Sequence, residues 1–226
     1  MTETFIICII GGYLLGSVPF GLVVTRLAGL GDIRKIGSGN IGATNVLRTG
    51  RKDLALLTVL LDASKAGFAA WLALRFVPAE DMFFAGIFTS TNLVAALYAG
   101  TAAIIGHNFP VWLKFKGGKG VATLVGAVLG IHPITVLLCF GIWFIVLMIT
   151  HYVSLSSMIA GCCFPVFVLL SPKINHSVPL VVFSFVIAAL LIWTHRKNID
   201  RLKKGTESKI YIWRPVASRR RNDPDK

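Results

Sequence analysis

The sequence predicts an all-α protein, a polytopic integral membrane bundle of helices, and three observations lead to that class. Of the 226 residues, 55% are hydrophobic and only 15% are charged, whereas a soluble domain carries about 25% charged residues. The mean hydropathy is +0.74. Several apolar runs reach the roughly 20 residues that a helix needs to cross a bilayer core. The chain is therefore expected to cross a membrane several times.

Seven apolar runs are candidate spans. No basic region precedes the first run and no small-residue cleavage site follows it, so we interpret it as a retained span and not as a signal peptide. The fourth run is short and contains glycine (VATLVGAVLGI), and its alternatives are a re-entrant segment or one half of a hairpin turning at His132-Pro133. The seven runs are residues 4–26, 53–76, 82–105, 119–131, 133–150, 155–171 and 178–194.

The distribution of basic residues favours seven spans over six. With seven spans and the N-terminus outside, 20 of the 23 basic residues fall on one face, Arg75 and Lys173 fall on the other, and Lys65 lies within a span. Such an excess marks the cytoplasmic face, which then also holds the C-terminus. Six spans would separate the basic C-terminal end from the other basic loops. We expect one membrane-embedded domain, residues 1–207, and a basic, flexible cytoplasmic tail, residues 208–226.

The formal net charge of +13 requires an anionic partner. Nucleic acid is one class, but a basic surface also suits the inner face of a membrane or phosphorylated metabolites, and the membrane spans favour the latter two. The four cysteines all lie inside apolar runs, without CxxC spacing. We therefore expect no disulfide, no metal site and no other cofactor.

The first polar segment is GSGNIGATN, residues 37–45. Glycines let the backbone approach a ligand closely, and successive N–H groups in such a turn can bind an anion. Ser38, Asn40, Thr44 and Asn45 add side-chain donors, and Arg48 follows within reach. A flexible connector is the alternative, but connectors rarely combine so many donors with glycines. The pattern favours binding of a phosphate.

The second polar segment is GHNFPVWLKFKGGKG, residues 106–120. Glycines flank Lys119 just before an apolar run, so backbone donors, a helix N-terminus and a point charge would meet at one phosphate site. The spacing of a Walker A loop is absent, which argues against ATP hydrolysis. Lys116 could instead contact anionic lipid, and His107 is either a base or a hydrogen-bonding partner of the loop.

The third polar segment is THRKNIDRLKKGTE, residues 194–207. His195, Asn198 and Arg201 recur at spacings of three and would share one helical face. A basic helix at the inner leaflet is often only a lipid anchor. Glu207 among so many cations is not expected of an anchor, which favours a functional role for His195 and Asn198.

Two further groups are polar within or beside apolar runs. Asp62 and Lys65 lie three residues apart inside the second run, where unpaired charges are costly, so they pair structurally or shape the floor of a site. The sequence SLSS, residues 154–157, is either a helix cap or a source of a hydroxyl donor such as Ser157.

Together these motifs carry a resemblance. The order GSGN-x-GATN, then GH-x-x-P with FKGGKG, then H-x-x-NI-x-RL-x-x-GTE resembles the bacterial acylphosphate-dependent glycerol-3-phosphate acyltransferase family, from the first span through Glu207. The resemblance implies an inner-membrane enzyme that moves a fatty acyl group from acyl phosphate to the 1-hydroxyl of glycerol 3-phosphate. It also implies release of phosphate and lysophosphatidate, in the first acylation of phospholipid synthesis.

From the resemblance and the residues we predict direct transfer at a cytoplasmic-face site, with Ser38 as an acyl nucleophile being the rival. The predicted catalytic residues are Ser38, Asn40, Lys119, His195 and Asn198. The predicted substrate-binding residues are Gly39, Thr44, Asn45, Arg48, His107, Lys116, Gly117, Gly118, Gly120, Ser157, Arg201 and Glu207, with Asp62 and Lys65 in support.

The alternative function is a membrane transporter of a phosphorylated metabolite. A carrier needs polar residues through the depth of several spans and often an internal repeat. Deep polarity here is nearly confined to Asp62 and Lys65, and no repeat is evident. The expected partners are the two substrates and membrane lipid, without nucleic acid. The oligomeric state stays open, with a monomer favoured.

Overall fold

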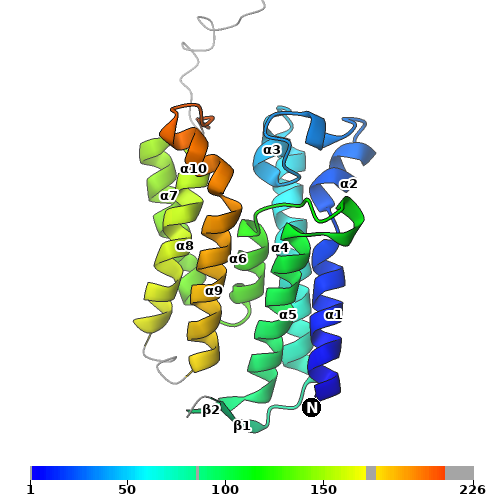
Figure 1. Cartoon of the computed structure of the whole chain (residues 1–226), viewed down its shortest axis with the longest axis vertical. Coiled ribbons are helices and arrows are strands. Elements are labelled where there is room, and N and C mark those ends of the chain that lie inside the picture. Colours follow the sequence, from blue (N-terminus) through cyan, green and yellow to red (C-terminus); the bar gives the residue numbers. More distant parts are fainter. Residues whose placement is uncertain (1, 85–86, 172–176, 212–226) are drawn as a thin grey trace, which may run out of the picture.

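The computed structural model describes residues 2–84, 87–171 and 177–211, and within them the protein is a bundle of helices with one small hairpin (Figure 1). Lys173 and residues 212–226 of the predicted tail lie outside the described residues. The helices are α1 (Thr2–Ser17), α2 (Phe20–Leu27), α3 (Ala43–Leu47), α4 (Lys52–Phe76), α5 (Thr91–Asn108), α6 (Val121–Leu129), α7 (Pro133–Thr150), α8 (Val153–Leu169), α9 (Val178–Thr194) and α10 (Arg196–Lys203). Short 3-10 turns, η1 (Ile33–Lys35) and η2 (Val111–Leu113), lie in the connections.

The all-helical class is confirmed, and four helical stretches of the described residues are long and apolar enough to cross a membrane. They are Thr2–Leu27, Lys52–Phe76, Thr91–Leu113 and Pro133–Thr150, and the α9–α10 pair, bent by 53°, makes a fifth if it counts as one span. The fourth predicted span is only the nine-residue α6, which is about 13 Å long. That length covers roughly half of a bilayer core.

Two predicted spans differ from the helices observed. The first is interrupted at Pro19, which lacks an N–H group and ends α1 before α2 begins. The third was predicted to begin at residue 82, but its start is an antiparallel hairpin of β1 (Asp81–Phe84) and β2 (Ile87–Ser90), with Asp81 opposite Ser90. The aromatic and β-branched residues of this segment favour a strand, and α5 begins only at Thr91.

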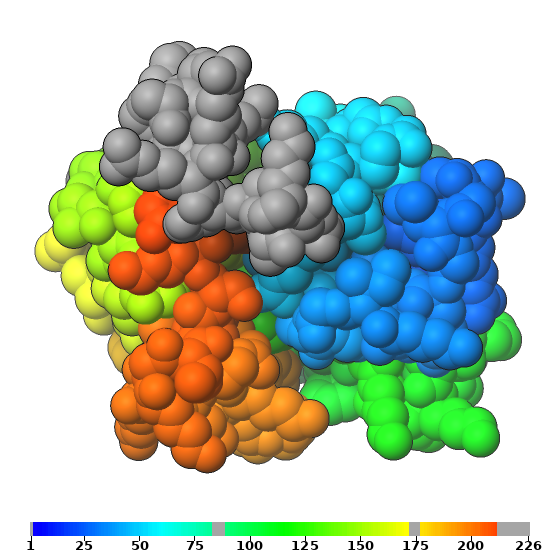
Figure 2. All heavy atoms as spheres, turned by 90° about the horizontal axis from the view of Figure 1, so that it is seen from above, coloured from blue at the N-terminus to red at the C-terminus, as the bar shows by residue number. Residues whose placement is uncertain are grey.

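The three polar segments lie at one end of the bundle, which we call the polar end, opposite the N-terminus (Figure 1). Seen from above that end, the chain from α2 through α3 lies on one side and α9 with α10 lies on the other (Figure 2). The charge distribution of the sequence predicts that these segments share one face of the membrane. In the structure they lie at one end of the bundle. The short α6 begins below this end, so the glycine-rich loop before it lies between the helices (Figure 1).

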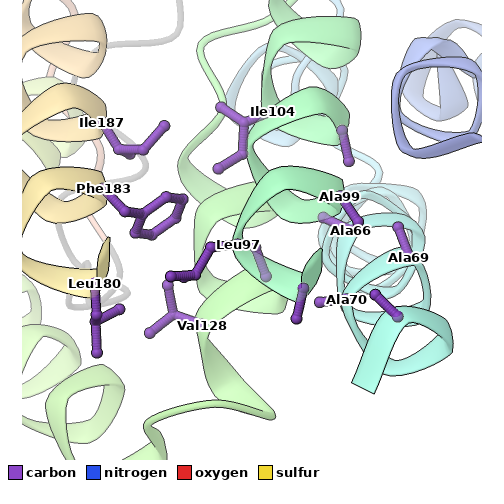
Figure 3. Packing of buried hydrophobic residues seen from close by; sticks show 14 of the residues in the cluster. Ala66, Ala69, Ala70, Leu97, Ala99, Ile104, Val128, Leu180, Phe183 and Ile187 are labelled. Carbon is purple, nitrogen blue, oxygen red and sulfur yellow. The ribbon is translucent and has the colours of Figure 1, made fainter. Parts of the chain in front are cut away.

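Small residues let α1, α4, α5 and α6 approach closely. Figure 3 shows alanines such as Ala66 and Ala99 between α4 and α5, whereas larger side chains lie between α5 and α9. A Cβ atom on Gly126 of α6 would lie 1.9 Å from the Ala63 carbonyl oxygen of α4. Such glycine contacts are typical of membrane helix pairs, where packing replaces the hydrophobic effect. They fix α6 against α4 and so hold its N-terminal loop in place.

This packing predicts different results for two helical glycine-to-alanine changes. Gly126→Ala forces the α4 backbone to move and should destabilise the protein by about 1–3 kcal/mol. Gly141→Ala on α7 is the matched control, because its Cβ meets nothing within 4 Å, and it should be neutral or stabilise by up to about 1 kcal/mol. Thermal unfolding in detergent micelles measures both. Equal unfolding midpoints would contradict the close α4–α6 contact.

Candidate active site

One cavity of about 410 Å³ lies among the three polar segments and continues between α6, α7 and α8. Its lining changes character with depth. Polar and charged residues line the part at the polar end: Ser38, Asn40, Thr44, Asn45, Arg48, Asp62, His107, Lys119, Ser154, Ser157, His195, Asn198 and Glu207. The rest is an apolar arm, whose walls are Val121, Leu124, Val125, Val128, Val136, Leu137, Cys139, Phe140, Trp143, Ala160, Phe164 and Leu191.

The first polar segment is folded around the buried amide of Asn45. Its Oδ1 accepts from the Ser38 N–H at 2.9 Å, and its Nδ2 donates to the carbonyls of Ile33, Ile36 and Asn40 at 2.9–3.0 Å. We predicted that Asn45 binds substrate, but these bonds occupy both polar atoms. Asn45 is instead the residue that shapes the loop and positions Ser38 in the cavity.

The glycines of this segment provide shape and not free donors. Gly39 has a left-handed φ of 70°, and its N–H donates to the Ile36 carbonyl at 3.0 Å. The N–H of Gly42 donates to Asn40 Oδ1 at 2.8 Å. The amides of Gly39 and Gly42 are therefore not available to an anion, which corrects the expectation for Gly39. The side chains of Ser38, Thr44 and Arg48 are what this loop presents to the cavity.

The second polar segment is held by the C-terminal end of α5. The N–H of Gly117 donates to the Asn108 carbonyl at 3.1 Å, and the N–H of Gly118 donates to the His107 carbonyl at 2.9 Å. These bonds correct the prediction that both amides bind phosphate. Asn40 joins the two loops, since its Nδ2 lies 3.4 Å from the Gly117 carbonyl oxygen.

Lys119 and Gly120 of this loop line the cavity, whereas Lys116 is exposed outside its lining. Burial lowers the pKa of Lys119 to about 8, and the nearby positive charges of Arg201 and Arg48 act in the same direction against the attraction of Glu207. Among the described residues no carboxylate lies within 4 Å of its ammonium. Lys119 is thus a cation in the cavity lining without a carboxylate partner among the described residues. Burial also lowers the pKa of Arg48, which stays charged at neutral pH because arginine titrates far above it.

The third polar segment is organised by Glu207. Its Oε1 accepts from Ser154 Oγ at 2.7 Å and from Asn198 Nδ2 at 2.6 Å, and its Oε2 accepts from Arg201 Nε at 2.6 Å. Burial raises the pKa of Glu207, but these three hydrogen bonds outweigh it and hold the pKa below its ordinary value. An ionised carboxylate repels phosphate, so Glu207 is a clamp for these three side chains; because it also lines the cavity, its contact with substrate stays a prediction. Arg201 likewise pairs with Glu207 and does not line the cavity.

The clamp leaves one polar atom of Asn198 and one of His195 without a hydrogen-bond partner in the described chain. The amide of Asn198 turns Nδ2 to the carboxylate, so its buried Oδ1 is free. The Nδ1 of His195 lies 2.8 Å from the Leu191 carbonyl oxygen, which can only accept, so Nδ1 carries the hydrogen. Burial lowers the pKa of His195 to about 4. The neutral ring therefore keeps its Nε2 lone pair as an acceptor.

Sequence reasoning missed Ser154 and the apolar arm. Ser154 belongs to the SLSS sequence, and only its bond to Glu207, 53 residues away, distinguishes it from the predicted Ser157. The hydroxyl of Ser157 donates to the Val153 carbonyl at 2.8 Å and accepts from Trp143 Nε1 at 3.1 Å, so it braces the wall of the cavity. In the sequence alone, the residues of the apolar arm cannot be distinguished from residues that face lipid.

The supporting pair is confirmed as a pair. Lys65 Nζ lies 2.9 Å from Asp62 Oδ1, and both side chains are buried. Asp62 and His107 line the cavity wall, while Lys65 lies behind them. Among the described residues no cluster of three or more His, Cys, Asp or Glu side chains could hold a metal ion.

A membrane helical bundle whose cavity joins the cations Arg48 and Lys119 to an apolar arm indicates a class: a membrane protein with a binding site for an anionic group and an apolar chain. The family follows from comparison. The model for glycerol-3-phosphate acyltransferase matches residues 6–205, so the chain belongs to that family. The resemblance seen in the motifs is confirmed, and the protein is an acyltransferase of phospholipid synthesis.

Relatives and solved structures agree with this assignment. A glycerol-3-phosphate acyltransferase of Rhizobium etli is 51% identical over 199 residues, 88% of each chain. One of Rhodospirillum rubrum is 49% identical over 210 residues, 90% of each chain. The crystal structure of PlsY (YgiH), an integral membrane glycerol 3-phosphate acyltransferase in its glycerol 3-phosphate form, superposes with a TM-score of 0.80 at 36% identity, over 92% of this chain and 96% of that one. Its lysophosphatidic acid form gives 0.78 at 35% identity, over 92% and 95%.

The pKa of Lys119 predicts how anion binding depends on pH. A lysine is charged below its pKa, so inorganic phosphate should bind progressively more weakly as the pH rises through about 8. Inorganic phosphate itself gains charge near neutral pH and is mainly a dianion where Lys119 titrates, so the titration of the ligand cannot cause the loss of binding. Lys119→Arg is the matched control and should flatten the profile between pH 7 and 9.5. Titration calorimetry in micelles measures both, and a flat wild-type profile would contradict the role of Lys119.

Proposed function

We propose that this protein transfers a fatty acyl group from an acyl phosphate to the 1-hydroxyl of sn-glycerol 3-phosphate. The products are lysophosphatidate and inorganic phosphate, in the first acylation of bacterial phospholipid synthesis. The observation that carries this proposal is the continuity of one cavity from the cations Arg48 and Lys119 into an apolar arm. Acyl phosphate has the same two parts, a phosphate and an alkyl chain. Acyl-CoA and acyl carrier protein are not the direct donors.

The phosphate groups bind at the cationic part of the cavity. Arg48 and Lys119 supply charge, and Ser38, with Asn40 and Thr44 beside it, supplies hydroxyl and amide donors. The acyl chain lies in the apolar arm, beside Val125 and Phe140. Holding both substrates in this way turns a reaction between two molecules into one within a complex, which is worth several kcal/mol.

The glycerol hydroxyl is oriented by the two free acceptors, His195 Nε2 and Asn198 Oδ1. A ring with a pKa of about 4 orients a hydroxyl well but accepts its proton poorly. A phosphate oxygen, with a second pKa of about 6, is the better acceptor. The hydroxyl oxygen attacks the acyl carbon, the bond from that carbon to the phosphate oxygen breaks, and the hydroxyl proton goes to a phosphate oxygen.

Transfer is direct and needs no acyl-enzyme. The Ser38 hydroxyl lies 3.2 Å from Asn45 Oδ1, and no histidine, lysine or carboxylate in the described residues is within hydrogen-bond distance of it. A serine without such a base is a weak nucleophile. The acyl phosphate is already activated, so positioning and charge stabilisation supply the acceleration. No metal or other cofactor takes part.

The protein lies in the bacterial inner membrane as a single domain of residues 1–207, with seven crossings and its active site on the cytoplasmic face. The chain direction supports this, because α1 starts at the end opposite the polar end and successive long elements alternate in direction (Figure 1). In this arrangement the N-terminus is outside and the C-terminus is cytoplasmic. A monomer contains all the residues of the proposed site.

This orientation predicts the labelling of single cysteines introduced into a variant whose four native cysteines are replaced. Gly50→Cys, at the polar end, should react with an impermeant maleimide only after the membrane of intact cells is opened. Glu80→Cys, before the hairpin, should react in intact cells. Both positions are exposed. The opposite pattern would place the site outside and contradict the positive-inside reading.

The reaction itself predicts turnover by the purified protein alone. In micelles with acyl phosphate and glycerol 3-phosphate, inorganic phosphate should be released in equal amount to lysophosphatidate, with or without a chelator. Acyl-CoA in place of acyl phosphate should give no product. Loss of activity with the chelator would contradict the absence of a metal, and use of acyl-CoA would contradict the proposed donor.

The same assay compares a variant at the proposed site with a matched control on the same helix. Asn198→Ala removes an acceptor for the hydroxyl and should lower kcat/KM roughly 10- to 100-fold, as expected for a buried hydrogen bond. Asp200→Ala, on the exposed face of the same helix, should leave it unchanged. Full activity in Asn198→Ala would remove that residue from the scheme, and a trapped acyl-Ser38 would replace direct transfer by a covalent route.

A further inference from the structure

The buried ammonium of Lys65 meets three acceptors. Its Nζ lies 2.9 Å from Asp62 Oδ1, 2.9 Å from the Val18 carbonyl oxygen and 2.9 Å from His107 Nδ1. The Val18 carbonyl is available because Pro19 interrupts the helix there. A lysine ammonium has three hydrogens and no lone pair. The contacts with Val18 and His107 are hydrogen bonds, whereas the contact with Asp62 is an ion pair, since Asp62 Oδ1 has no hydrogen-bond partner among the described residues.

The hydrogen bond from Lys65 Nζ indicates the tautomer of His107. An ammonium only donates, so His107 Nδ1 must accept from Lys65 and carries no hydrogen in the neutral ring. The competing contact, from His107 Nδ1 to Asp62 Oδ1, is longer at 3.4 Å. The hydrogen of the neutral ring is then on Nε2. His195 has the opposite tautomer, because its Nδ1 donates to the Leu191 carbonyl.

The Nε2 edge of His107 lies against the loop that carries Lys119. A Cβ atom on Gly118 would be 1.9 Å from His107 Nε2, so only glycine fits over the ring. The backbone reinforces this placement, since the Gly118 N–H donates to the His107 carbonyl at 2.9 Å. His107 lines the cavity together with Lys119. No residue that the structure describes accepts a hydrogen bond from Nε2.

We propose that His107 donates its Nε2 hydrogen to a phosphate oxygen held by Lys119, and that Lys65 is the positioning residue that keeps His107 a donor. This inference rests on the proposed function for the identity of the phosphate, but the tautomer itself does not. The cavity then holds two histidines of opposite tautomer, one donating to a phosphate and one accepting from a hydroxyl. A pair buried only for packing would have no effect on the ring of His107.

Nitrogen-15 NMR of the histidine-labelled protein in micelles at pH 7.5 tests the tautomer directly. The His107 and His195 signals are assigned by their loss in His107→Gln and His195→Gln. We expect a protonated Nε2 in His107 and a protonated Nδ1 in His195. A protonated Nδ1 in His107 would overturn the proposal. This measurement needs no turnover, so its result is independent of whether acyl phosphate is the donor.

A pair of variants separates positioning from packing. Lys65→Met leaves Asp62 as an unpaired buried charge and should lower the unfolding temperature. Asp62→Asn with Lys65→Met removes both charges at nearly constant volume and should restore that temperature. We expect the double variant still to bind phosphate at least about 5-fold more weakly and to show mixed His107 tautomers. Wild-type phosphate affinity in the stable double variant would mean that the pair serves packing alone.

If neither Lys65 variant folds, replacements of His107 test whether its side chain donates a hydrogen bond to phosphate. The side-chain amide of glutamine can place a donor near the position of Nε2, whereas leucine cannot. His107→Gln should therefore retain most of the phosphate affinity, and His107→Leu should lose at least about 5-fold. Equal affinity of the two variants would contradict a donor at this position.

Discussion

Hydrocarbon supplies no hydrogen bonds, so every charged group inside this bundle must find its partners within the protein or in a ligand. Glu207 accepts three hydrogen bonds from α8 and α10. Lys65 donates one to the break at Pro19 and one to His107 of α5, and it forms an ion pair with Asp62 of α4. Lys119 has no such carboxylate partner within the described residues. The paired charges of Glu207 and Lys65 thus form the walls of the site. Lys119, which has no carboxylate partner among the described residues, faces the cavity.

The glycine-rich loops serve a different purpose from the one that their composition suggests. The amides of Gly42, Gly117 and Gly118 close turns on Asn40, Asn108 and His107, and so these three are not free to bind an anion. Glycine is required because the loops press against other backbone and against the His107 ring. Charge recognition is left to side chains, which the closed loops hold in fixed positions.

Much of the fold could be read from the sequence, because apolar runs and the distribution of basic residues report directly on spans and faces. The bounds of α7 and α9 agree with the predicted runs 133–150 and 178–194. The hairpin before α5 could not be predicted, since its aromatic residues are as apolar as a span. In the site, the motifs located the segments. They could not tell ligands from clamps such as Asn45 and Glu207, because that depends on which partner a side chain meets in space.

The recessed start of α6 also bears on how the protein works with a lipid-like molecule. A helix of nine residues leaves the neighbouring α7 and α8 unaccompanied over about half of their length, and the apolar arm lies beside them. An amphiphile resting in the leaflet can therefore bring its head to the charged groups while its tail stays at its own depth. In the proposed reaction, the alkyl chain then need not be extracted into water, a transfer that costs about 0.8 kcal/mol for each methylene.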